Sequence, residues 1–288
     1  MRIFTTLAEV RAAGRELRAA RKTLGFVPTM GALHEGHLSL VRAARAGCDA
    51  VTVSIFVNPT QFGPNEDFSK YPRTFAADCE LLESEGVDWV FAPQVEEIYP
   101  PGAITFVEVA GLSDRLDGAS RPGHFRGVAT VVAKLFNIVA PDKAFFGQKD
   151  AAQVAVLRQM VRDLNFNLEL IVCPTSRDPD GLAMSSRNRY LSAAERQQAL
   201  ALSRALHAAE RQAAAGVHDP AVLLAEAHAI LDQEPAVRLD YLAAVDPDTL
   251  LPASELGNGI LLTVAAFVGT TRLIDNVILA GAPPAPEA

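Results

Sequence analysis

The sequence predicts an α/β protein with two domains: a parallel-sheet domain over residues 1–175 and a smaller α+β domain over residues 176–288. Through the first part, short apolar runs alternate with segments of helical spacing, which is typical of a parallel sheet covered by helices on both faces. After residue 174 the pattern changes to two alanine-rich helical segments followed by adjacent strands. The length of 288 residues also fits two domains of roughly 150 residues each.

The predicted strands of the first domain are short and apolar. The strongest covers residues 50–57, where a run of apolar and β-branched side chains indicates a buried strand. The other expected strands are 24–27, 89–92, 105–109, 143–146 and 167–172. The helices expected between them, from apolar residues three and four positions apart, are 7–22, 37–46, 74–85, 127–139 and 151–163.

The second domain begins with a polar loop over residues 175–189. Alanine-rich segments of helical spacing follow, and then three runs that read as strands. We expect helices over 193–215 and 220–232, strands over 237–245, 259–266 and 271–279, and a loose tail, rich in proline and alanine, over 281–288.

Composition excludes several classes of protein. Nearly half of the residues are apolar, enough for a substantial core, and the net charge of −8 argues against coating nucleic acid or a membrane surface. Cys48, Cys79 and Cys173 are far apart without metal-ligand spacing, so we expect reduced core residues. The N-terminus does not resemble a signal peptide, and no apolar run approaches the roughly 20 residues that span a bilayer. We therefore expect a cytoplasmic protein with no nucleic-acid or membrane partner.

The most informative segment is 28–37 (PTMGALHEGH), where a predicted strand meets a predicted helix. A helix start offers N–H groups and the positive end of a dipole to a phosphate, and glycines let a ligand approach the backbone closely. His34 and His37 would add hydrogen bonds or positive charge. Spacing alone leaves two alternatives, histidines that merely belong to a turn, or a metal site, although no third ligand lies nearby in the sequence.

A second loop, 146–150 (FGQKD), has the same strand–glycine–helix arrangement. Lys149 would meet a phosphate as a point charge, and Asp150 would cap the helix or hold a magnesium–phosphate complex. Gln153, one turn further along the helix, would face the same cleft. An ordinary capped turn is the alternative.

Three further segments carry polar groups of interest. The loop 181–188 (GLAMSSRN) offers hydroxyls and an arginine to phosphate, or is an interdomain linker. The amides of 58–62 (NPTQF) would position a small polar substrate. The stretch 121–127 (RPGHFRG) is either a phosphate contact or a tight turn. Since the chain has no P-loop, no GxGxxG after the first strand and no GxSxG, the phosphate-binding loops together favour a different kind of nucleotide enzyme.

Taken together, these motifs closely resemble the pantothenate synthetase (pantoate–β-alanine ligase) family. The resemblance runs in order over nearly the whole chain through PTMGALHEGH at 28–37, VNPTQF at 57–62, residues 67–73, FGQKD at 146–150 and MSSRN at 184–188. HxGH alone would indicate only the nucleotidyltransferase superfamily, whereas NPTQF and GQKD narrow the resemblance to the family. It implies a Rossmann-like first domain of the class I aminoacyl-tRNA-synthetase type and a second domain that acts as a lid.

The resemblance also implies a reaction. ATP, with Mg²⁺, adenylates the carboxylate of (R)-pantoate and releases diphosphate, and the amine of β-alanine then attacks the pantoyl adenylate to give pantothenate and AMP. The family further implies a homodimer through the first domain. Two alternatives remain open: another nucleotidyltransferase that uses a phosphorylated substrate, and a nucleotide-binding regulator without catalytic activity.

Residue roles follow from the matching positions. His37 would be the proton donor, His34 and Lys149 would act with it on the phosphates, and Gln61 and Gln153 would hold pantoate, with Gln61 also near β-alanine. No residue is assigned to a metal. Ser176 departs from the family, which usually has a small apolar residue, commonly valine, against the adenine. The resemblance assigns these residues to ATP: Met30, Gly31, Ala32, Leu33, His34, Glu35, Gly36, His37, Gly147, Gln148, Lys149, Asp150, Ser176, Met184, Ser185, Ser186 and Arg187.

Overall fold

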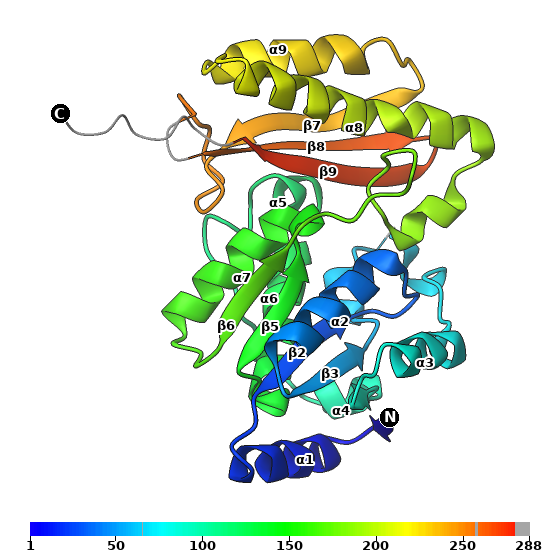
Figure 1. Cartoon of the computed structure of the whole chain (residues 1–288), viewed down its shortest axis with the longest axis vertical. Coiled ribbons are helices and arrows are strands. Elements are labelled where there is room, and N and C mark those ends of the chain that lie inside the picture. Colours follow the sequence, from blue (N-terminus) through cyan, green and yellow to red (C-terminus); the bar gives the residue numbers. More distant parts are fainter. Residues whose placement is uncertain (65, 257–258, 280–288) are drawn as a thin grey trace, which may run out of the picture. The chain divides into compact units, whose positions relative to one another are not determined.

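The computed structural model describes residues 1–64, 66–256 and 259–279, so the tail expected to be loose, 281–288, lies outside it (Figure 1). Contacts between Cα atoms divide the chain into two compact units. The first unit comprises residues 1–148 and 156–176, and the second comprises residues 149–155 and the chain from 177 onward. The boundaries between the units fall after Gln148, after Ala155 within a helix, and directly after Ser176.

The first unit is built on a six-stranded parallel sheet with the strand order β1-β4-β3-β2-β5-β6. The strands are β1 (Arg2–Phe4), β2 (Leu24–Thr29), β3 (Ala50–Ile55), β4 (Trp89–Phe91), β5 (Lys143–Gly147) and β6 (Glu169–Cys173). Apart from the short edge strand β1, each lies where an apolar run predicts a strand. The parallel-sheet prediction is confirmed.

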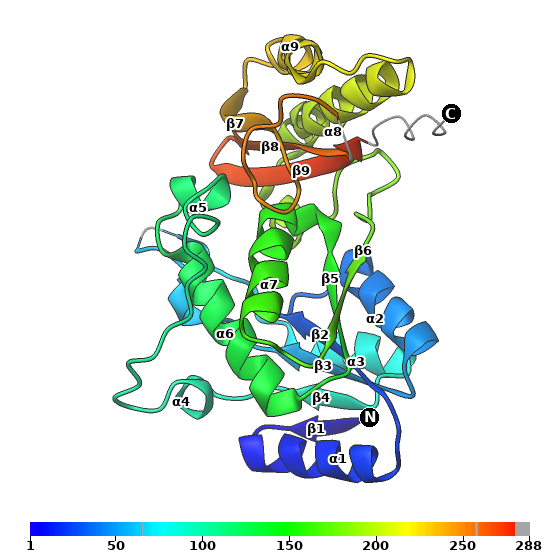
Figure 2. The same cartoon turned by 90° about the vertical axis from the view of Figure 1, so that its left-hand side faces the viewer.

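Helices cover both faces of this sheet. On one face lie α2 (Glu35–Gly47) and α3 (Phe75–Ser84), and on the other lie α1 (Leu7–Ala19), α6 (His124–Val139) and most of α7 (Ala151–Asp163) (Figure 2). Val41 of α2 and Leu82 of α3 pack with sheet residues in one apolar cluster, and Phe136 of α6 packs edge-on against Phe26 and Phe146 on the opposite face. The short helices are α4 (Val95–Ile98), α5 (Asp117–Ser120) and the 3₁₀ turns η1 (Pro59–Gln61), η2 (Asp67–Ser69), η3 (Gln148–Asp150) and η4 (Ser186–Tyr190).

The order in which successive strands are added to the sheet changes direction at β2. The chain passes from β2 to β3 on one side, whereas β5 joins β2 on the other. Within these strands, β2 and β5 pair only through Gly25–Lys143 and Phe26–Ala144, so they separate toward their carboxyl ends. In open parallel sheets the ligand crevice lies at this point.

The second unit contains an antiparallel sheet of β7 (Val237–Val245), β8 (Ile260–Val268) and β9 (Thr271–Leu279). Two helices, α8 (Ala193–Ala214) and α9 (Pro220–Leu231), pack on one face of it, as Figure 1 shows. Small residues of α8, including Ala201 and Ala205, are fully buried among leucines and valines, which lets the helix approach the sheet closely. The α+β prediction for this part is confirmed.

Two local predictions are wrong. Residues 105–109 are predicted to be a strand, but they form none. The Val107 N–H instead donates to Thr130 Oγ1 of α6 at 2.9 Å, so side-chain bonding replaces a ladder. The cysteines are all free, but only Cys173 is buried, and Cys48 and Cys79 are half-buried rather than core residues.

Candidate active site

The two histidines of the HxGH motif stand at the start of α2. His34 is the N-cap residue, two residues earlier than the predicted start would place it, and His37 occupies the third helical position. The His37 Nδ1 atom accepts the His34 N–H at 3.4 Å, and the two rings lie 4.1 Å apart between centroids. Because Nδ1 accepts, the neutral His37 ring carries its proton on Nε2, where it is a donor. Both histidines are half-buried at the carboxyl edge of the sheet.

The segment before His34 is a tight turn directly after β2. Gly31 and Ala32 both have positive φ angles, 79° and 52°. The Gly31 N–H donates to Thr29 Oγ1 at 3.1 Å, and the N–H groups of Ala32 and Leu33 donate to the two carboxylate oxygens of Asp78 at 3.0 and 2.8 Å. The turn therefore has a defined acceptor for each of these three amides.

Gln61 follows β3 and has a fixed orientation. Asn58, only 1% exposed, donates from Nδ2 to Gln61 Oε1 at 3.0 Å and to the Gly127 carbonyl at 3.2 Å. The Gln61 amide nitrogen then lies 3.2 Å from Met30 Sδ, in the turn that follows β2. Two residues predicted from separate motifs are thus in contact, and Asn58 holds the amide that joins them.

The backbone of Gln61 is held from α6. His124 Nδ1 lies 2.8 Å from the Gln61 carbonyl oxygen, and its Nε2 lies 3.0 Å from Arg121 Nη1. A carbonyl only accepts and a guanidinium only donates, so His124 is neutral with its proton on Nδ1. Burial and the Arg121 charge lower the pKa of His124 to about 4. Arg121 forms a bidentate pair with Glu66 at 2.7 and 2.6 Å, which favours the tight-turn interpretation of 121–127.

This histidine makes folding stability depend on pH. Its pKa falls from 6.5 in the unfolded chain to about 4 in the fold, so the unfolded state binds more protons between these values. We expect the contribution of His124 to the free energy of unfolding to be complete above pH 6.5. As the pH falls from 6.5 toward 4, the free energy of unfolding should decrease by up to about 1.4 kcal/mol per pH unit. Urea unfolding at pH 7, 6 and 5 measures this. His124→Asn keeps a donor at the Nδ1 position, and an equal loss of stability in that variant would assign the effect to other groups.

Ser176 follows the carboxyl end of β6. Its Oγ lies 3.1 Å from Ser39 Oγ, and Ser39 itself donates to the Gly36 carbonyl at 2.9 Å. Since Ser39 has one proton to give, Ser176 is the donor of this pair. The Ser176 hydroxyl is thereby directed at Ser39 near the start of α2.

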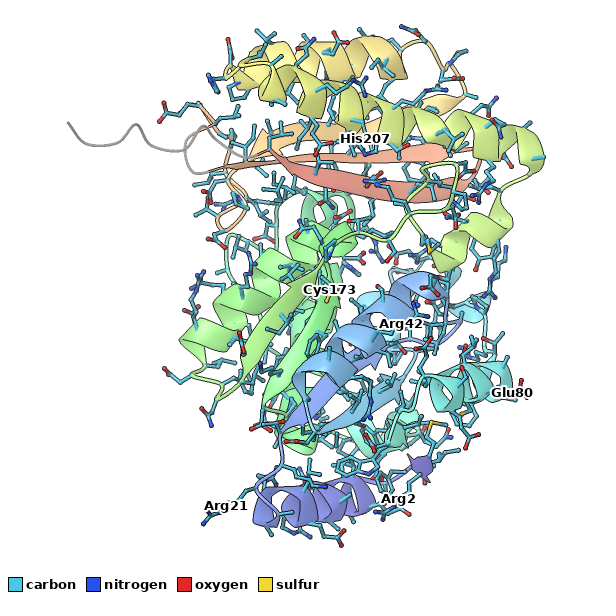
Figure 3. The ribbon with its side chains drawn as sticks, viewed as in Figure 1. Arg2, Arg21, Arg42, Glu80, Cys173 and His207 are labelled. Carbon is cyan, nitrogen blue, oxygen red and sulfur yellow. The ribbon has the colours of Figure 1, made fainter. Side chains whose placement is uncertain are left out.

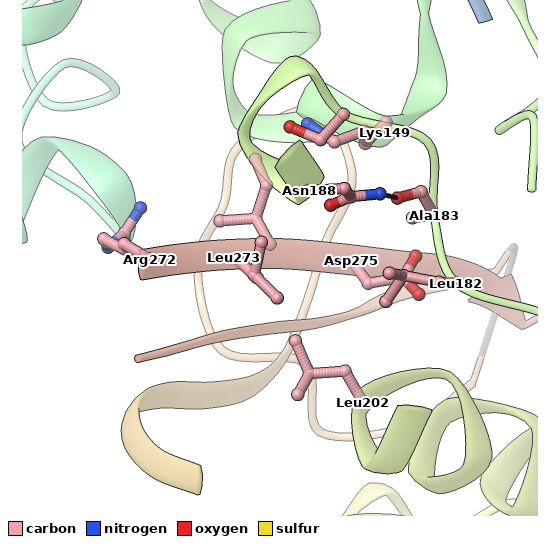
Figure 4. Close-up of a pocket in the computed structure, with 10 residues that line it drawn as sticks. Lys149, Leu182, Ala183, Asn188, Leu202, Arg272, Leu273 and Asp275 are labelled. Atoms are coloured by element: carbon pink, nitrogen blue, oxygen red, sulfur yellow. Dashed lines mark hydrogen bonds between the residues drawn. The ribbon is translucent and has the colours of Figure 1, made fainter. Parts of the chain in front are cut away.

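In the second unit, Lys149 and Ser185 line one pocket together with Asn188 and Asp275 (Figure 4). The Lys149 carbonyl accepts from Asn276 Nδ2 of β9 at 2.9 Å, so the backbone of this lysine is tied to the sheet. Asn188 Nδ2 donates to the Ala183 carbonyl at 3.0 Å, as the dashed line in Figure 4 shows.

The loop that carries Ser185 is anchored at both ends. Arg177 pairs with the buried carboxylate of Asp275 through two contacts of 2.6 and 3.0 Å. Ser185 Oγ accepts the Arg187 N–H at 3.3 Å and caps η4. The MSSRN loop is therefore held by defined contacts rather than being a solvated linker.

The remaining predicted residues divide between the units. Gly147 ends β5 and Gln148 begins η3 in the first unit, while Asp150, Gln153, Met184 and Ser186 belong to the second. Ser186 is buried, and the others are half-buried. Sequence reasoning missed the supporting residues Asp78 and Asp275, named His124 only within the segment 121–127, and gave Asn58 only a weak role. Asn58 has a local signal, because it caps η1 directly before Pro59, whereas Asp78 bonds residues 45 and 46 positions away.

No group of three or more His, Cys, Asp or Glu side chains that could hold a metal ion occurs among residues 1–64, 66–256 and 259–279. In the same described part of the chain, no helix is both long enough and apolar enough to cross a membrane.

Known proteins resemble the chain along its whole length. The family model for pantoate-beta-alanine ligase matches residues 2–278. A pantothenate synthetase of Acidobacterium capsulatum is 66% identical over 99% of each chain, and one of Koribacter versatilis is 60% identical over 98% of this chain and 97% of that protein.

Solved structures agree. A pantothenate synthetase of Thermus thermophilus superposes with a TM-score of 0.92 at 50% identity, over 96% of this chain and 99% of that one. A pantoate-beta-alanine ligase of Francisella tularensis, solved with beta-gamma ATP and beta-alanine, gives a TM-score of 0.79 at 35% identity over 96% of this chain and 97% of that one. The chain therefore belongs to the pantoate-beta-alanine ligase family, the enzymes that form pantothenate in an ATP-dependent reaction.

Proposed function

We propose that this chain adenylates (R)-pantoate with ATP and then transfers the pantoyl group to β-alanine, using the residues described above. The contact between Gln61 and Met30 carries the proposal, because it joins the amide expected to bind pantoate to the turn that leads to His34 and His37. A glutamine amide suits a hydroxy acid since it offers both a donor and an acceptor without net charge.

In the first step a pantoate carboxylate oxygen attacks the α-phosphorus, the new O–P bond forms, and the bond to diphosphate breaks. This displacement needs alignment and neutralisation of growing negative charge rather than covalent help from the protein. His37 offers its Nε2 proton to the phosphates beside His34, and Lys149 adds a positive charge. In the second step the amine attacks the acyl carbon and AMP leaves.

We propose Mg²⁺ as the companion of ATP, with Asp150 as its protein ligand. Asp150 has a side chain that is 47% exposed, with one oxygen 3.5 Å from Lys149 Nζ, so the carboxylate is available to a cation. Magnesium typically binds one or two carboxylates together with substrate phosphates. Bound there, it would neutralise phosphate charge during the first step.

The remaining parts of the proposal rest on the family resemblance. Residues 1–175 would bind ATP and pantoate, while the loop 175–189 and the domain 176–288 would act as a lid, since a pantoyl adenylate must be shielded from water. Gln153 would bind pantoate beside Gln61, and the backbone of Ser176 would contact adenine. We also propose a homodimer through the first domain and a cytoplasmic location.

AMP release tests the proposed function. The purified protein is given ATP, Mg²⁺, pantoate and β-alanine, with each omitted in turn, and we expect sustained AMP release only from the complete mixture. Exchange of labelled diphosphate into ATP should require pantoate but not β-alanine. Nucleotide transfer to a phosphate ester without pantoate-dependent exchange would identify another nucleotidyltransferase, and ATP binding without AMP would identify a regulator.

Replacing Gln61 by alanine should mainly impair the use of pantoate. We expect KM for pantoate to rise at least tenfold, a loss of about 1.4 kcal/mol or more, because one hydrogen-bonding amide is removed from a site already held in place by Asn58. Steady-state kinetics with varied pantoate measures this. Gln94→Ala, at an exposed position of the same unit, is the matched control. An unchanged KM for pantoate would count against the assignment.

A further inference from the structure

The turn that leads to the HxGH histidines is held in an unfavourable backbone conformation. Ala32 has a φ angle of 52°, in the left-handed region that L-residues other than Asn and Asp seldom adopt. Gly31 precedes it at 79°. A non-glycine residue in this region persists only where surrounding contacts enforce it.

The carboxylate of Asp78, on α3, supplies that enforcement. Its oxygens Oδ2 and Oδ1 accept the N–H groups of Ala32 and Leu33 at 3.0 and 2.8 Å. Thr74 Oγ1 lies 3.1 and 3.2 Å from the same two oxygens, and Asp78 is only 2% exposed. An ideal Cβ atom on Gly31 would lie 3.0 Å from Oδ2, so turn and carboxylate fit closely.

Successive amides in such a turn form a concave site that usually binds an anion. Here the anion is part of the chain, so the amides of Ala32 and Leu33 are already occupied by a carboxylate. A substrate phosphate at this edge must then be bound by the groups that follow, His34, His37 and the start of α2. The backbone direction at the end of the turn sets the position of His34 at the N-cap, and with it the position of the His37 ring that accepts the His34 N–H.

We propose that Asp78 is a positioning residue for adenylation, acting through the Ala32 and Leu33 amides on His34 and His37. This rests on the proposed roles of the two histidines. Asp78 touches no reacting atom in this scheme. It fixes the turn, and the turn fixes where the histidines meet the phosphates.

Asp78→Asn is the central test, since it keeps the shape but presents a donor to one of the two N–H groups. We expect kcat for pantoate-dependent diphosphate exchange to fall 10- to 100-fold and KM for β-alanine in the complete reaction to remain unchanged. Glu80→Gln on the same helix is the control for charge, because Glu80 is exposed and projects away from α3 (Figure 3). It should retain wild-type exchange.

A merely structural role for Asp78 must be separated from positioning. Leu82→Ala removes a fully buried α3 side chain from the core cluster but leaves the Asp78 carboxylate and its acceptors for the turn amides in place. At a temperature where urea unfolding shows both variants folded, Leu82→Ala should keep its kcat while Asp78→Asn does not. The double variant Asp78→Asn with Ala32→Gly should recover at least threefold of the loss, because glycine adopts the positive φ angle without strain.

Each outcome decides the proposal. If Asp78→Asn fails to fold, Thr74→Val, which removes only the hydroxyl beside the carboxylate, should lower kcat two- to fivefold in folded protein. Wild-type kcat in folded Asp78→Asn overturns the proposal. Where Asp78→Asn does not fold, wild-type kcat in Thr74→Val overturns it instead. The proposal also fails if Leu82→Ala reproduces the loss of kcat, or if adding Ala32→Gly to Asp78→Asn leaves that loss unchanged. Absence of pantoate-dependent exchange in the wild type and in Glu80→Gln would instead contradict the proposed function.

Discussion

His37→Ala should lower turnover by about 10²–10³, equivalent to ~3–4 kcal/mol of transition-state stabilisation. The His37 ring accepts the His34 N–H through Nδ1, so the neutral ring carries its proton on Nε2, and in the proposed mechanism this proton is donated to the phosphates. Removal leaves the charge that develops on ATP without this preorganised group. Initial rates of AMP formation at saturating substrates measure the effect, with circular dichroism to verify the fold.

His37→Gln separates catalysis from helix capping. Glutamine at the third helical position can accept the N-cap N–H, as in a capping box, but it lacks the imidazole. We therefore expect the glutamine variant to match the alanine variant in turnover while the alanine variant alone loses about 0.5–1 kcal/mol of stability. Turnover near the wild-type value in either folded variant would remove His37 from the mechanism.

The sequence predicts the sheet of the first unit well because every strand except the short edge strand β1 carries its own signal. Residues 50–57 are apolar and β-branched, and a run of this kind is stable only when both faces are covered. The same rule places the functional loops, since carboxyl ends of parallel strands share one edge. The contact between Met30 and Gln61 illustrates this, because the two residues follow β2 and β3, which are neighbours in the sheet.

Supporting contacts could not be predicted, because they depend on side chains that are distant in sequence. In the sequence, Asp78 resembles any other acidic residue of a surface helix. Only the fold shows that its carboxylate accepts the Ala32 N–H. His124 looks like part of a basic loop, yet its buried ring is neutral and holds the Gln61 carbonyl. The false strand at 105–109 has the same origin, since Thr130 of α6 provides the partner that a neighbouring strand would otherwise provide.

Lys149→Ala should lower turnover by a similar factor, about 10²–10³. The substitution removes a positive charge fixed in the proposed site, and water that takes its place would stabilise the developing phosphate charge less well. The lysine backbone is fixed by Asn276, and its side chain is 20% exposed with Nζ 3.5 Å from Asp150. A partly exposed pair of this kind contributes little to stability, so the fold should be retained.

Two comparisons make the Lys149 result specific. Lys143→Ala removes a lysine from the other end of β5, where Nζ lies 3.4 Å from Glu169, and it should leave turnover unchanged. Lys149→Arg keeps the charge but replaces a compact ammonium with a planar fork, so we expect an intermediate rate. Rates measured with varied ATP show whether kcat or KM carries the loss. If a phosphate contact in the transition state is the role of Lys149, kcat must fall; a change in KM for ATP alone would reduce that role to ground-state binding.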